Sequence, residues 1–319
     1  MRTLITGGAG FIGSHLADHL LARGDEVLLL DDLSTGSRRN VAHLLDRPDV
    51  ELVVGSILDE DALGEAMARC DRVFHLAAAV GVHLVVDKPL ESLRTNIRGS
   101  ELVFEQAHAH RRPILVTSTS EIYGKNASEV LCEDDDRILG SPLKSRWAYS
   151  ESKAVDEILA YTYYRQKGLP AVIVRLFNTV GPRQTGQYGM VIPRFVAQAL
   201  RGEPITVYGD GTQRRCFCHV ADVVGALVDL LEAEHAHGRV FNVGGTEEIS
   251  IKALAERIVA RVGSSSPIRT IPYDEAYEAG FEDMPRRVPD LSRAAEAVGF
   301  APRRDLDAIL DAVIAAQRA

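Results

Sequence analysis

A tyrosine and a lysine four positions apart, Tyr149 and Lys153, form the most informative pair for chemistry in the sequence. On a helix this spacing puts both side chains on one face, one turn apart, so both can act on one substrate. A free tyrosine has a pKa of about 10, so a phenol that removes protons at neutral pH needs a nearby cation to stabilise its phenolate. The Lys153 ammonium can supply that charge, which indicates that Tyr149 is a general base.

Three glycines, Gly7, Gly10 and Gly13, predict a dinucleotide site between the first strand and the first helix. In this arrangement one glycine makes the tight turn, a second lets the backbone approach a pyrophosphate, and a third lets helix and sheet pack closely. The helix N-terminus, which includes Phe11 and Ile12, offers N–H donors and a positive dipole to the phosphates.

An acidic residue, Asp31, follows the glycines by about twenty residues, at the end of the second predicted strand. Its carboxylate can accept hydrogen bonds from both ribose hydroxyls and would repel a 2′-phosphate. We therefore expect NAD rather than NADP. Only Arg38 and Arg39 argue for NADP, because they could bind a 2′-phosphate.

The segment Val116–Gly124 follows the fifth predicted strand and contains Thr119. Together with the glycine motif, Tyr149 and Lys153, it resembles the extended short-chain dehydrogenase/reductase family, over essentially the whole chain. The resemblance implies that Tyr149 removes the proton of a sugar hydroxyl, that NAD takes the hydride, and that Thr119 hydrogen-bonds the same oxygen. Lys153 is then also expected to hold the nicotinamide ribose.

The same resemblance implies the remaining walls of the NAD site. One departure is Ser56, because many relatives carry an aspartate there that faces the adenine. The further residues that we expect to contact NAD are Ile57, Leu76, Ala77, Ala78, Asn96 and Thr117.

Two downstream segments resemble those that bind a nucleotide-sugar diphosphate in this family. Arg175–Arg183 resembles the segment that joins cofactor and substrate, and Val207–Phe217 resembles a substrate-lobe segment specific to nucleotide-sugar enzymes. We expect Asn178 and Arg215 to bind the diphosphate of a UDP-sugar. The full set of expected substrate contacts is Asn178, Arg183, Val191, Tyr208, Arg215 and Arg287.

The choice of reaction depends on Thr119, Ser120 and Glu121, because all reactions of this group can begin with oxidation of the sugar at C4. A dehydratase would have an aspartate beside the glutamate to protonate the departing hydroxyl, and Ser120 is a poor acid. A typical 4-epimerase of the family lacks the glutamate. The Thr-Ser-Glu order resembles the UDP-glucuronate decarboxylases (UDP-xylose synthases), in which a β-keto acid loses its C6 carboxylate as CO2.

Residues 145–149 and 281–290, the latter with Arg287, also resemble that subgroup. We therefore expect decarboxylation of UDP-glucuronate to UDP-xylose. The alternative is a UDP-sugar 4-epimerase, acting on UDP-glucose and UDP-galactose or on UDP-glucuronate and UDP-galacturonate. A dTDP-glucose 4,6-dehydratase-like enzyme and a catalytically silent NAD-binding protein rank third, and the intact Tyr149 and Lys153 argue against the silent protein.

Short apolar runs that alternate with amphipathic stretches predict the elements that position these residues. They indicate an α/β fold, a doubly wound parallel sheet of the Rossmann type with helices on both faces and ligands at the carboxyl ends of its strands. Glycines and prolines cluster after Asn178, which predicts a smaller C-terminal substrate-binding lobe. The expected division is 1–177 plus about 219–243 for the NAD-binding domain, and 178–218 plus about 244–319 for the lobe. The expected strands of the sheet are Arg2–Thr6, Val27–Asp31, Val50–Val54, Arg72–Leu76, Ile114–Ser118, Ala171–Leu176 and Val240–Val243.

Composition narrows the class of protein further. The 319 residues are 46% hydrophobic and 25% charged, as in ordinary globular proteins, and the net charge of -9 argues against nucleic-acid binding. No apolar run approaches the roughly 18 residues of a membrane span, and the glycine motif leaves no room for a signal peptide, so we expect a cytoplasmic enzyme. The four cysteines lack the spacing of a metal site. The family resemblance implies a homodimer through helices at 89–109 and 147–167.

Overall fold

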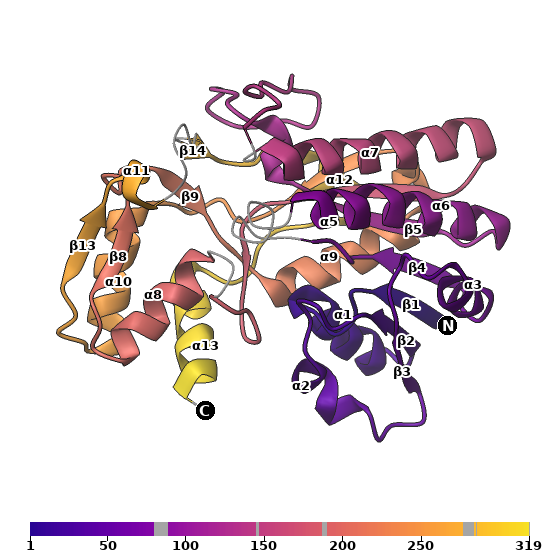
Figure 1. The fold of residues 1–319 in the computed structure, drawn as a ribbon, viewed down its shortest axis with the longest axis horizontal. Helices are drawn as coiled ribbons and strands as arrows, with labels where there is room; N and C mark the ends of the chain where they lie inside the picture. Colours follow the sequence, from indigo (N-terminus) through magenta and orange to yellow (C-terminus); the bar gives the residue numbers. More distant parts are fainter. Residues whose placement is uncertain (80–88, 145–146, 187–189, 277–283, 285, 319) are drawn as a thin grey trace.

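The computed structural model describes residues 1–79, 89–144, 147–186, 190–276, 284 and 286–318. Its main feature is a seven-stranded sheet with the strand order β11-β6-β5-β4-β1-β2-β3, in which every neighbouring pair is parallel (Figure 1). This confirms the predicted doubly wound parallel sheet. Its strands are β1 (Arg2–Thr6), β2 (Glu26–Asp31), β3 (Val50–Val54), β4 (Arg72–His75), β5 (Ile114–Thr119), β6 (Ala171–Leu176) and β11 (Val240–Val243).

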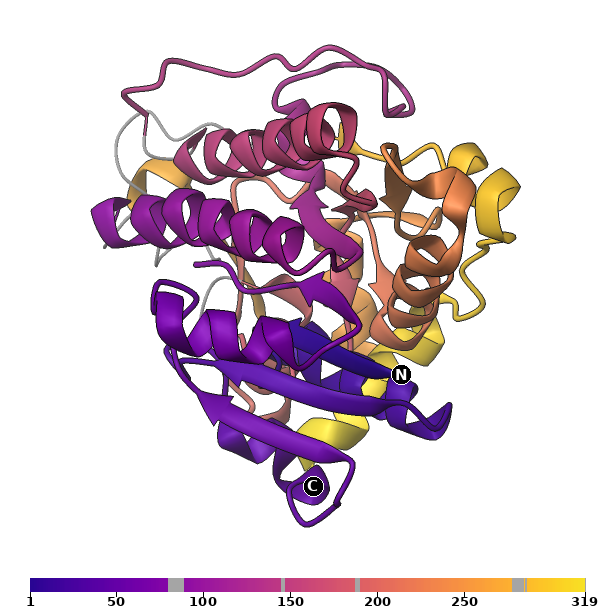
Figure 2. The ribbon, with the colours of Figure 1, turned by 90° about the vertical axis from the view of Figure 1, so that its right-hand side faces the viewer.

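Helices cover both faces of this sheet, which explains why its strands are almost continuously apolar. Successive side chains of β2 alternate between the two faces: Leu29 packs into one core, while Leu28 and Leu30 pack into the other. The first face carries α1 (Phe11–Ala22) and α9 (Val220–Glu232), and the second carries α3 (Glu60–Ala68), α6 (Ser100–Ala109) and α7 (Ala148–Lys167). Figure 2 shows α6 and α7 lying side by side.

Short elements connect these layers and shape the edge where the strands end. A π-helical turn, η2, separates α5 from α6, so the predicted helix at 89–109 is interrupted near its middle. None of the helices in the described ranges is long and apolar enough to cross a membrane. The connecting elements are α2 (Arg38–Val41), η1 (Ala42–Leu44), α5 (Pro89–Arg94), η2 (Thr95–Gly99), η3 (Ser120–Tyr123), β7 (Thr179–Val180), β10 (Cys218–His219), η5 (Glu234–Ala236) and α11 (Tyr273–Ala276).

A second core lies beside the sheet, on the left in Figure 1, and includes Phe195, Leu254 and Ile309. One small parallel pair and one three-stranded sheet, β12-β9-β14, accompany its helices. We propose that this core defines the substrate-binding lobe expected from the sequence. The elements concerned are α8 (Val191–Leu200), β8 (Ile205–Tyr208), β9 (Arg214–Cys216), β12 (Glu248–Ser250), α10 (Ile251–Val262), β13 (Ile268–Ile271), β14 (Arg286–Arg287) and α13 (Leu306–Arg318).

One segment departs from the expected division of the chain. The sequence prediction assigned all of 244–319 to the second lobe, but α12 (Ser292–Val298) contacts α9 and β11. Ala294 and Phe300 belong to the core that contains Leu29, on the first face of the sheet. The chain therefore returns to the NAD-binding domain after β14, because a short amphipathic helix buries its apolar side on whichever core lies nearest.

The glycine turn after β1 is a point of very close backbone approach. Gly7 has φ +71°, a conformation that side chains rarely adopt, and a Cβ there would lie 2.8 Å from the amide nitrogen of Ala77. A Cβ on Gly13 would overlap the carbonyl oxygen of Gly7 and come within 2.8 Å of the Gly8 Cα. Only glycine at position 13 therefore lets α1 start directly against the turn.

Replacement of Gly13 by alanine should destabilise the fold, because the rigid backbone of the turn must move to admit one methyl group. We expect Gly13→Ala to lower the free energy of unfolding by about 1–3 kcal/mol, measured by denaturant or thermal unfolding. Gly225→Ala is the matched control, since Gly225 lies within α9 with open space around its Cα. That change should be neutral or stabilise by up to about 1 kcal/mol. Equal stability of the two variants would contradict this account of the turn.

Candidate functional site

A cavity of about 730 Å³ opens at the carboxyl ends of the strands and is lined by residues of both lobes. Its position agrees with the general rule for doubly wound sheets. The structure brings together almost all the residues that the sequence singled out. Those that line it are Gly7, Gly10, Phe11, Ile12, Gly13, Asp31, Ile57, Leu76, Ala77, Ala78, Thr117, Thr119, Ser120, Glu121, Tyr149, Asn178, Arg183, Val191, Tyr208, Arg215 and Arg287.

Two expected contacts, Lys153 and Asn96, lie behind the cavity wall and are each about 2% exposed. Asn96 belongs to the π-helical turn η2, and its side chain binds the backbone of Ala79 at both ends, with Oδ1 2.7 Å from the amide nitrogen and Nδ2 3.2 Å from the carbonyl oxygen. These two bonds brace the segment that ends at Ala79, and contact of Asn96 with the cofactor stays a prediction. π-turns often occur where a functional site needs such a local change of direction.

The cofactor end of the cavity combines the glycine turn with Asp31. The Asp31 carboxylate accepts hydrogen bonds from the amides of Ala9 at 2.9 Å and Leu33 at 2.8 Å, which fixes its orientation. Burial raises the pKa of Asp31, and these backbone amides oppose that rise. Arg38 and Arg39 are exposed and lie outside the described cavity lining. The turn, the N-terminus of α1 and this carboxylate fit the pyrophosphate and ribose of an NAD molecule.

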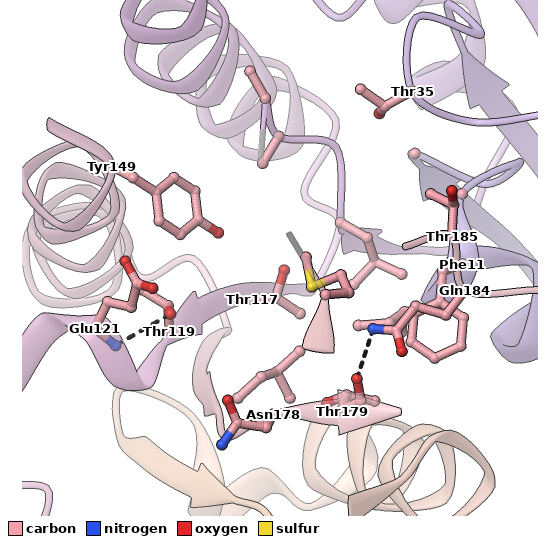
Figure 3. A pocket seen from close by; sticks show the side chains of 18 of the residues that line it. Phe11, Thr35, Thr117, Thr119, Glu121, Tyr149, Asn178, Thr179, Gln184 and Thr185 are labelled. Carbon is pink, nitrogen blue, oxygen red and sulfur yellow. Dashed lines mark hydrogen bonds between the residues drawn. The ribbon is translucent and has the colours of Figure 1, made fainter. Parts of the chain in front are cut away.

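The end predicted to be catalytic is formed by Tyr149 on α7, Thr119 at the end of β5 and Glu121 in η3 (Figure 3). The Thr119 hydroxyl accepts from the Glu121 amide at 3.2 Å, and the Ser150 hydroxyl donates to the Glu121 carbonyl at 2.9 Å. These bonds tie η3 to α7, so that the carboxylate and the phenol point into the same part of the cavity. Burial raises the pKa of Tyr149, and the negative charges of Glu121 and Asp156 raise it further.

An arginine from the other lobe completes this end of the site. Arg287 on β14 lies with Nη1 3.4 Å from the Ser120 Oγ and 3.8 Å from Glu121 Oε1. The side chains of Arg287 and Glu121 are 11% and 18% exposed, so water screens their interaction only weakly. The site therefore holds a phenol, a carboxylate and a guanidinium within one compartment.

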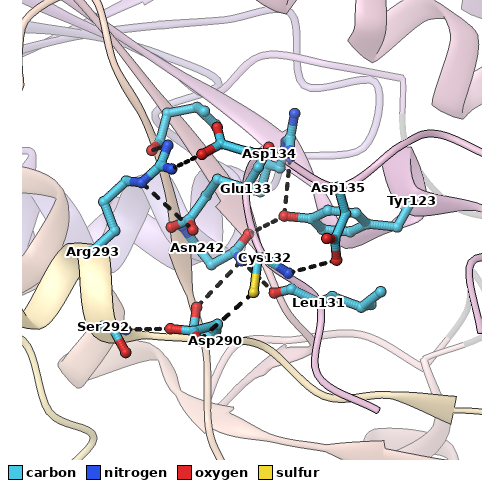
Figure 4. A network of polar contacts seen from close by, with 12 residues as sticks. Tyr123, Leu131, Cys132, Glu133, Asp134, Asp135, Asn242, Asp290, Ser292 and Arg293 are labelled. Atoms are coloured by element: carbon cyan, nitrogen blue, oxygen red, sulfur yellow. Dashed lines mark hydrogen bonds and ion pairs between the residues drawn. The ribbon is translucent and has the colours of Figure 1, made fainter. Parts of the chain in front are cut away.

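Backbone contacts hold the strand that carries Arg287 in place (Figure 4). The Leu131 amide donates to the Val288 carbonyl at 2.8 Å, and the Asp290 amide donates to the Leu131 carbonyl at 2.9 Å. Asn242 on β11 donates to the same Leu131 carbonyl at 2.9 Å and accepts from the Tyr123 hydroxyl at 2.7 Å. These contacts, which we call the Asn242 clamp, fix the position of β14 against the sheet.

The expected diphosphate ligands already have protein contacts. Asn178 Nδ2 donates to the Cys216 carbonyl at 2.8 Å, which uses one of its two N–H groups. Arg183 pairs with Asp18 at 2.6 Å, and Arg215 Nη1 donates to the neighbouring Arg214 carbonyl at 2.8 Å. These side chains are therefore anchored beside the cavity, and the two arginines place positive charge along its wall.

The sequence prediction missed several residues of the cavity wall. Arg194 is the most informative, because its guanidinium lies 4.3 Å from the centroid of the Tyr208 ring. A usable signal was its spacing from Val191, since residues three apart share a helix face. Residues 145, 146, 281–283 and 285 of the expected decarboxylase-like segments lie outside the described residues. The other missed wall residues with polar side chains include Asp32, Ser34, Thr35, Gln184, Thr185, Gln213 and Tyr273.

Comparison with known proteins places this site in a family. Residues 3–244 match the model of the NAD dependent epimerase/dehydratase family. The chain is 41% identical over 302 residues to a UDP-N-acetyl-alpha-D-glucosaminuronate decarboxylase of Bacillus cytotoxicus, covering 94% of this chain and 92% of that protein. It is 36% identical over 309 residues to UDP-glucuronic acid decarboxylase 1 of Arabidopsis thaliana, covering 96% of this chain and 67% of that one.

A solved structure with bound ligands is also similar. UDP-glucuronic acid 4-epimerase from Bacillus cereus, in complex with UDP-glucuronic acid and NAD, superimposes with a TM-score of 0.90 at 28% identity, covering 100% of this chain and 99% of that one. The glycine turn and the acidic residue on β2 provide the cofactor half of the site that such an enzyme requires. This chain therefore belongs to the NAD dependent epimerase/dehydratase family, and NAD is its cofactor.

Proposed function

We propose that this enzyme oxidises a UDP-linked hexuronate at C4 and releases its C6 carboxylate as CO2, with conversion of UDP-glucuronate to UDP-xylose as the reaction. The observation that carries the proposal is the pair of Glu121 and Arg287 beside Tyr149, with 3.8 Å between their charged groups. The similarity to two decarboxylases, at 41% and 36% identity, supports it.

The chemistry of the pair favours a substrate with a carboxylate. A guanidinium in a partly desolvated site binds a carboxylate strongly and with defined geometry. An enzyme that only inverts C4 of a neutral sugar needs neither this cation nor a second acid–base group. We propose that Arg287 orients the C6 carboxylate and that Glu121 handles a proton or organises a water molecule near C5.

The proposed reaction starts at the sugar C4 hydroxyl. Tyr149 removes the O4 proton, and Thr119 hydrogen-bonds the same oxygen. Bound NAD supplies the redox chemistry, since it can accept the C4 hydride and later return it. The C4 ketone makes the substrate a β-keto acid, so that its C5–C6 bond can break with the electron pair moving towards O4 as CO2 leaves. C5 then takes up a proton, with Glu121 in position to assist, and Tyr149 gives its proton back to O4.

A second substrate has a specific observation in its favour. The Bacillus cytotoxicus relative, at the higher identity, is named for UDP-N-acetylglucosaminuronate, which differs from UDP-glucuronate at C2 of the sugar. The same C4 and C6 chemistry serves both molecules, so a comparison of kcat/KM for the two sugars decides between them. The 4-epimerase alternative is favoured by the similar fold of the UDP-glucuronic acid 4-epimerase, which has a carboxylate substrate as well.

The individual roles of the site residues are part of the proposal. We propose that the glycine turn and the N-terminus of α1 hold the pyrophosphate of NAD, and that Asp31 holds the adenosine ribose. Asn178, Arg183 and Arg215 are proposed to hold the UDP diphosphate, because they line the cavity and carry N–H donors. Lys153 is proposed to act on Tyr149 and on the nicotinamide ribose from behind the wall.

We further propose a cytoplasmic homodimer. Exposed apolar side chains gather on the helices expected at the interface: Ile97 of η2 is 36% exposed, and Ile158 and Tyr161 of α7 are 62% and 50% exposed. Ile158 and Tyr161 are three residues apart and so share a helix face. All four cysteines are free thiols, as is usual in a reducing compartment.

Removal of the Asp31 carboxylate should lower the affinity for NAD and reduce the preference for NAD over NADP. We expect Asp31→Ala to raise the Kd for NAD by about 10-fold or more and to reduce any preference for NAD over NADP, because the variant loses charge-assisted hydrogen bonds to the ribose. Isothermal titration with both cofactors measures this. The control, Asp46→Ala, removes an exposed carboxylate outside the cavity lining and should leave both constants unchanged. An unchanged ratio of the two constants in Asp31→Ala would remove Asp31 from this role.

An acidic residue on the proposed interface should separate the subunits. We expect Ile158→Asp to convert the dimer into a monomer, because burying an unpaired carboxylate between apolar helices is unfavourable. Light scattering at micromolar concentration measures the mass. Val130→Asp, at a 41% exposed apolar position in the loop after η3, should remain a dimer. A fully active wild-type monomer under the same conditions would contradict the homodimer.

The proposed chemistry predicts different effects for the phenol and the carboxylate. Tyr149→Phe should lower kcat for every product by about 10²–10⁴-fold, because it removes the general base. Glu121→Gln should lower CO2 release by a factor of the same order while the Kd for NAD stays within about twofold. Glu129→Gln, in an exposed loop, is the matched control and should behave as wild type.

Mass spectrometry of the sugar nucleotide identifies the reaction, since decarboxylation changes its mass and epimerisation does not. We expect UDP-glucuronate to give UDP-xylose plus CO2 with catalytic amounts of enzyme and no net consumption of NAD. Formation of UDP-galacturonate, or interconversion of UDP-glucose and UDP-galactose, would instead establish the 4-epimerase and leave Glu121 without the proposed role.

A further inference from the structure

The charged partner of Lys153 is a second buried residue on the same helix. Lys153 Nζ lies 2.7 Å from Asp156 Oδ2, and the two side chains are 2% and 0% exposed. Two charges in such a place lose most of their hydration, so the pair is maintained only if each keeps close partners. Asp156 does not line the described cavity, and the reaction proposed above assigns it no role.

A chain of polar groups supports Asp156 from the sheet side. His75 at the end of β4 lies with Nδ1 2.7 Å from the Thr6 hydroxyl and Nε2 3.0 Å from the Ser100 hydroxyl. Complete burial lowers the pKa of His75 to about 3, so its ring is neutral and carries one proton. Among the described residues, the second oxygen of the Asp156 carboxylate, Oδ1, is buried without a hydrogen-bond partner. Burial raises the pKa of Asp156, whereas Lys153 and the Ser100 hydroxyl lower it.

We propose that Asp156, supported by Ser100 and His75, is a positioning residue that holds the Lys153 ammonium in place and moderates the positive field that Lys153 exerts on Tyr149. The observations that carry this are the short ion pair and the burial of both partners. The inference rests on the proposed function in one respect, namely that the reaction is redox-neutral.

A redox-neutral cycle explains why such moderation is useful. Tyr149 must remove a proton when the sugar is oxidised and give it back when the sugar is reduced. A phenol beside an unopposed ammonium would be a ready base but a poor acid, so offsetting part of the ammonium charge favours the return of the proton to O4. Asp156 offsets part of the Lys153 charge, and its own charge contributes to the raised pKa of Tyr149.

The other charged groups around this pair come from several elements. Glu121 of η3 faces Tyr149 and also raises its pKa, while Arg287 of β14 stands beside Glu121. On α7 itself, Glu157 is held in an ion pair with Arg175 of β6 at 2.8 Å. Each of these carboxylates is thus opposed by an arginine. Asp156 is instead opposed by Lys153, the cation that the mechanism requires.

The test is the pH dependence of the NAD-loaded enzyme with Asp156→Asn, which removes the charge and keeps the shape. We expect the acid limb of kcat/KM to move to lower pH by about one unit, because a negative charge close to Tyr149 is lost. Ultraviolet titration of the phenolate, taken as the difference from the matching Tyr149→Phe proteins, should move in the same direction. Glu151→Gln removes an exposed carboxylate from the same helix and should leave both curves unchanged.

Further outcomes decide the remaining cases. An acid limb and a phenolate titration that stay in place in a folded Asp156→Asn protein, or that move to higher pH, would overturn the inference. If Asp156→Asn does not fold, Ser100→Ala takes its place and should give a smaller shift to lower pH, and no shift would again overturn it. The profile is recorded with whichever UDP-sugar reaction mass spectrometry identifies, so a failure of the decarboxylase proposal is seen separately.

Discussion

Glu121 and Arg287 can contact each other because one cavity separates the carboxyl ends of the parallel strands from the second core. Glu121 follows one of these strands, and Arg287 comes from the other side of the cavity. Parallel strands end on the same side, so β1, β2 and β5 deliver the glycine turn, Asp31 and the η3 segment to one edge. The second core supplies β14, whose arginine would be far from the chemistry without a fixed strand beneath it. The proposed catalysis thus depends on how the second core is positioned against the sheet.

The Asn242 clamp holds the strand that carries Arg287 against the sheet, and the backbone amide and side chain of Asn242 are hydrogen-bonded there. Asn242 donates to Leu131 and accepts from Tyr123, and its own amide donates to the Glu133 carboxylate at 2.8 Å. A buried amide with this many partners stabilises one position of the strand. Any shifted position is less stable, because it leaves a buried polar group without a hydrogen bond. The cation Arg175 extends the network by donating to the Tyr123 hydroxyl at 3.0 Å. Packing of apolar side chains alone would fix the position of β14 less uniquely.

The sequence predicted the sheet, and it predicted that the glycine turn and Asp31 lie at one cavity, because both depend on local patterns. Continuous apolar runs identify buried strands, and the glycine spacing with Asp31 follows from the geometry of one turn and one strand end. The packing of α12 on the first core was not predictable. The sequence of a short amphipathic helix shows which face is buried, but not which core that face contacts. The burial of Asn96 was not predictable for a similar reason, because the π-helical turn that contains it has no sequence signature of its own. The pairing of Lys153 with Asp156 was visible as an i,i+3 spacing, but its burial comes from tertiary packing.

One fold can support several reactions on one oxidised sugar if different residues serve the redox steps and the steps that follow. In the proposed reaction Tyr149, Lys153 and the glycine turn would serve the redox steps, which are the same whether the sugar is epimerised, dehydrated or decarboxylated. The charged groups near C5 and C6 of the 4-keto sugar then determine which of these reactions follows. Here that charge comes from Glu121 on one lobe and Arg287 on the other, and the two lie close enough to modify each other. A carboxylate that enters this compartment competes with Glu121 for the guanidinium, so substrate binding itself would release Glu121 to act on a proton.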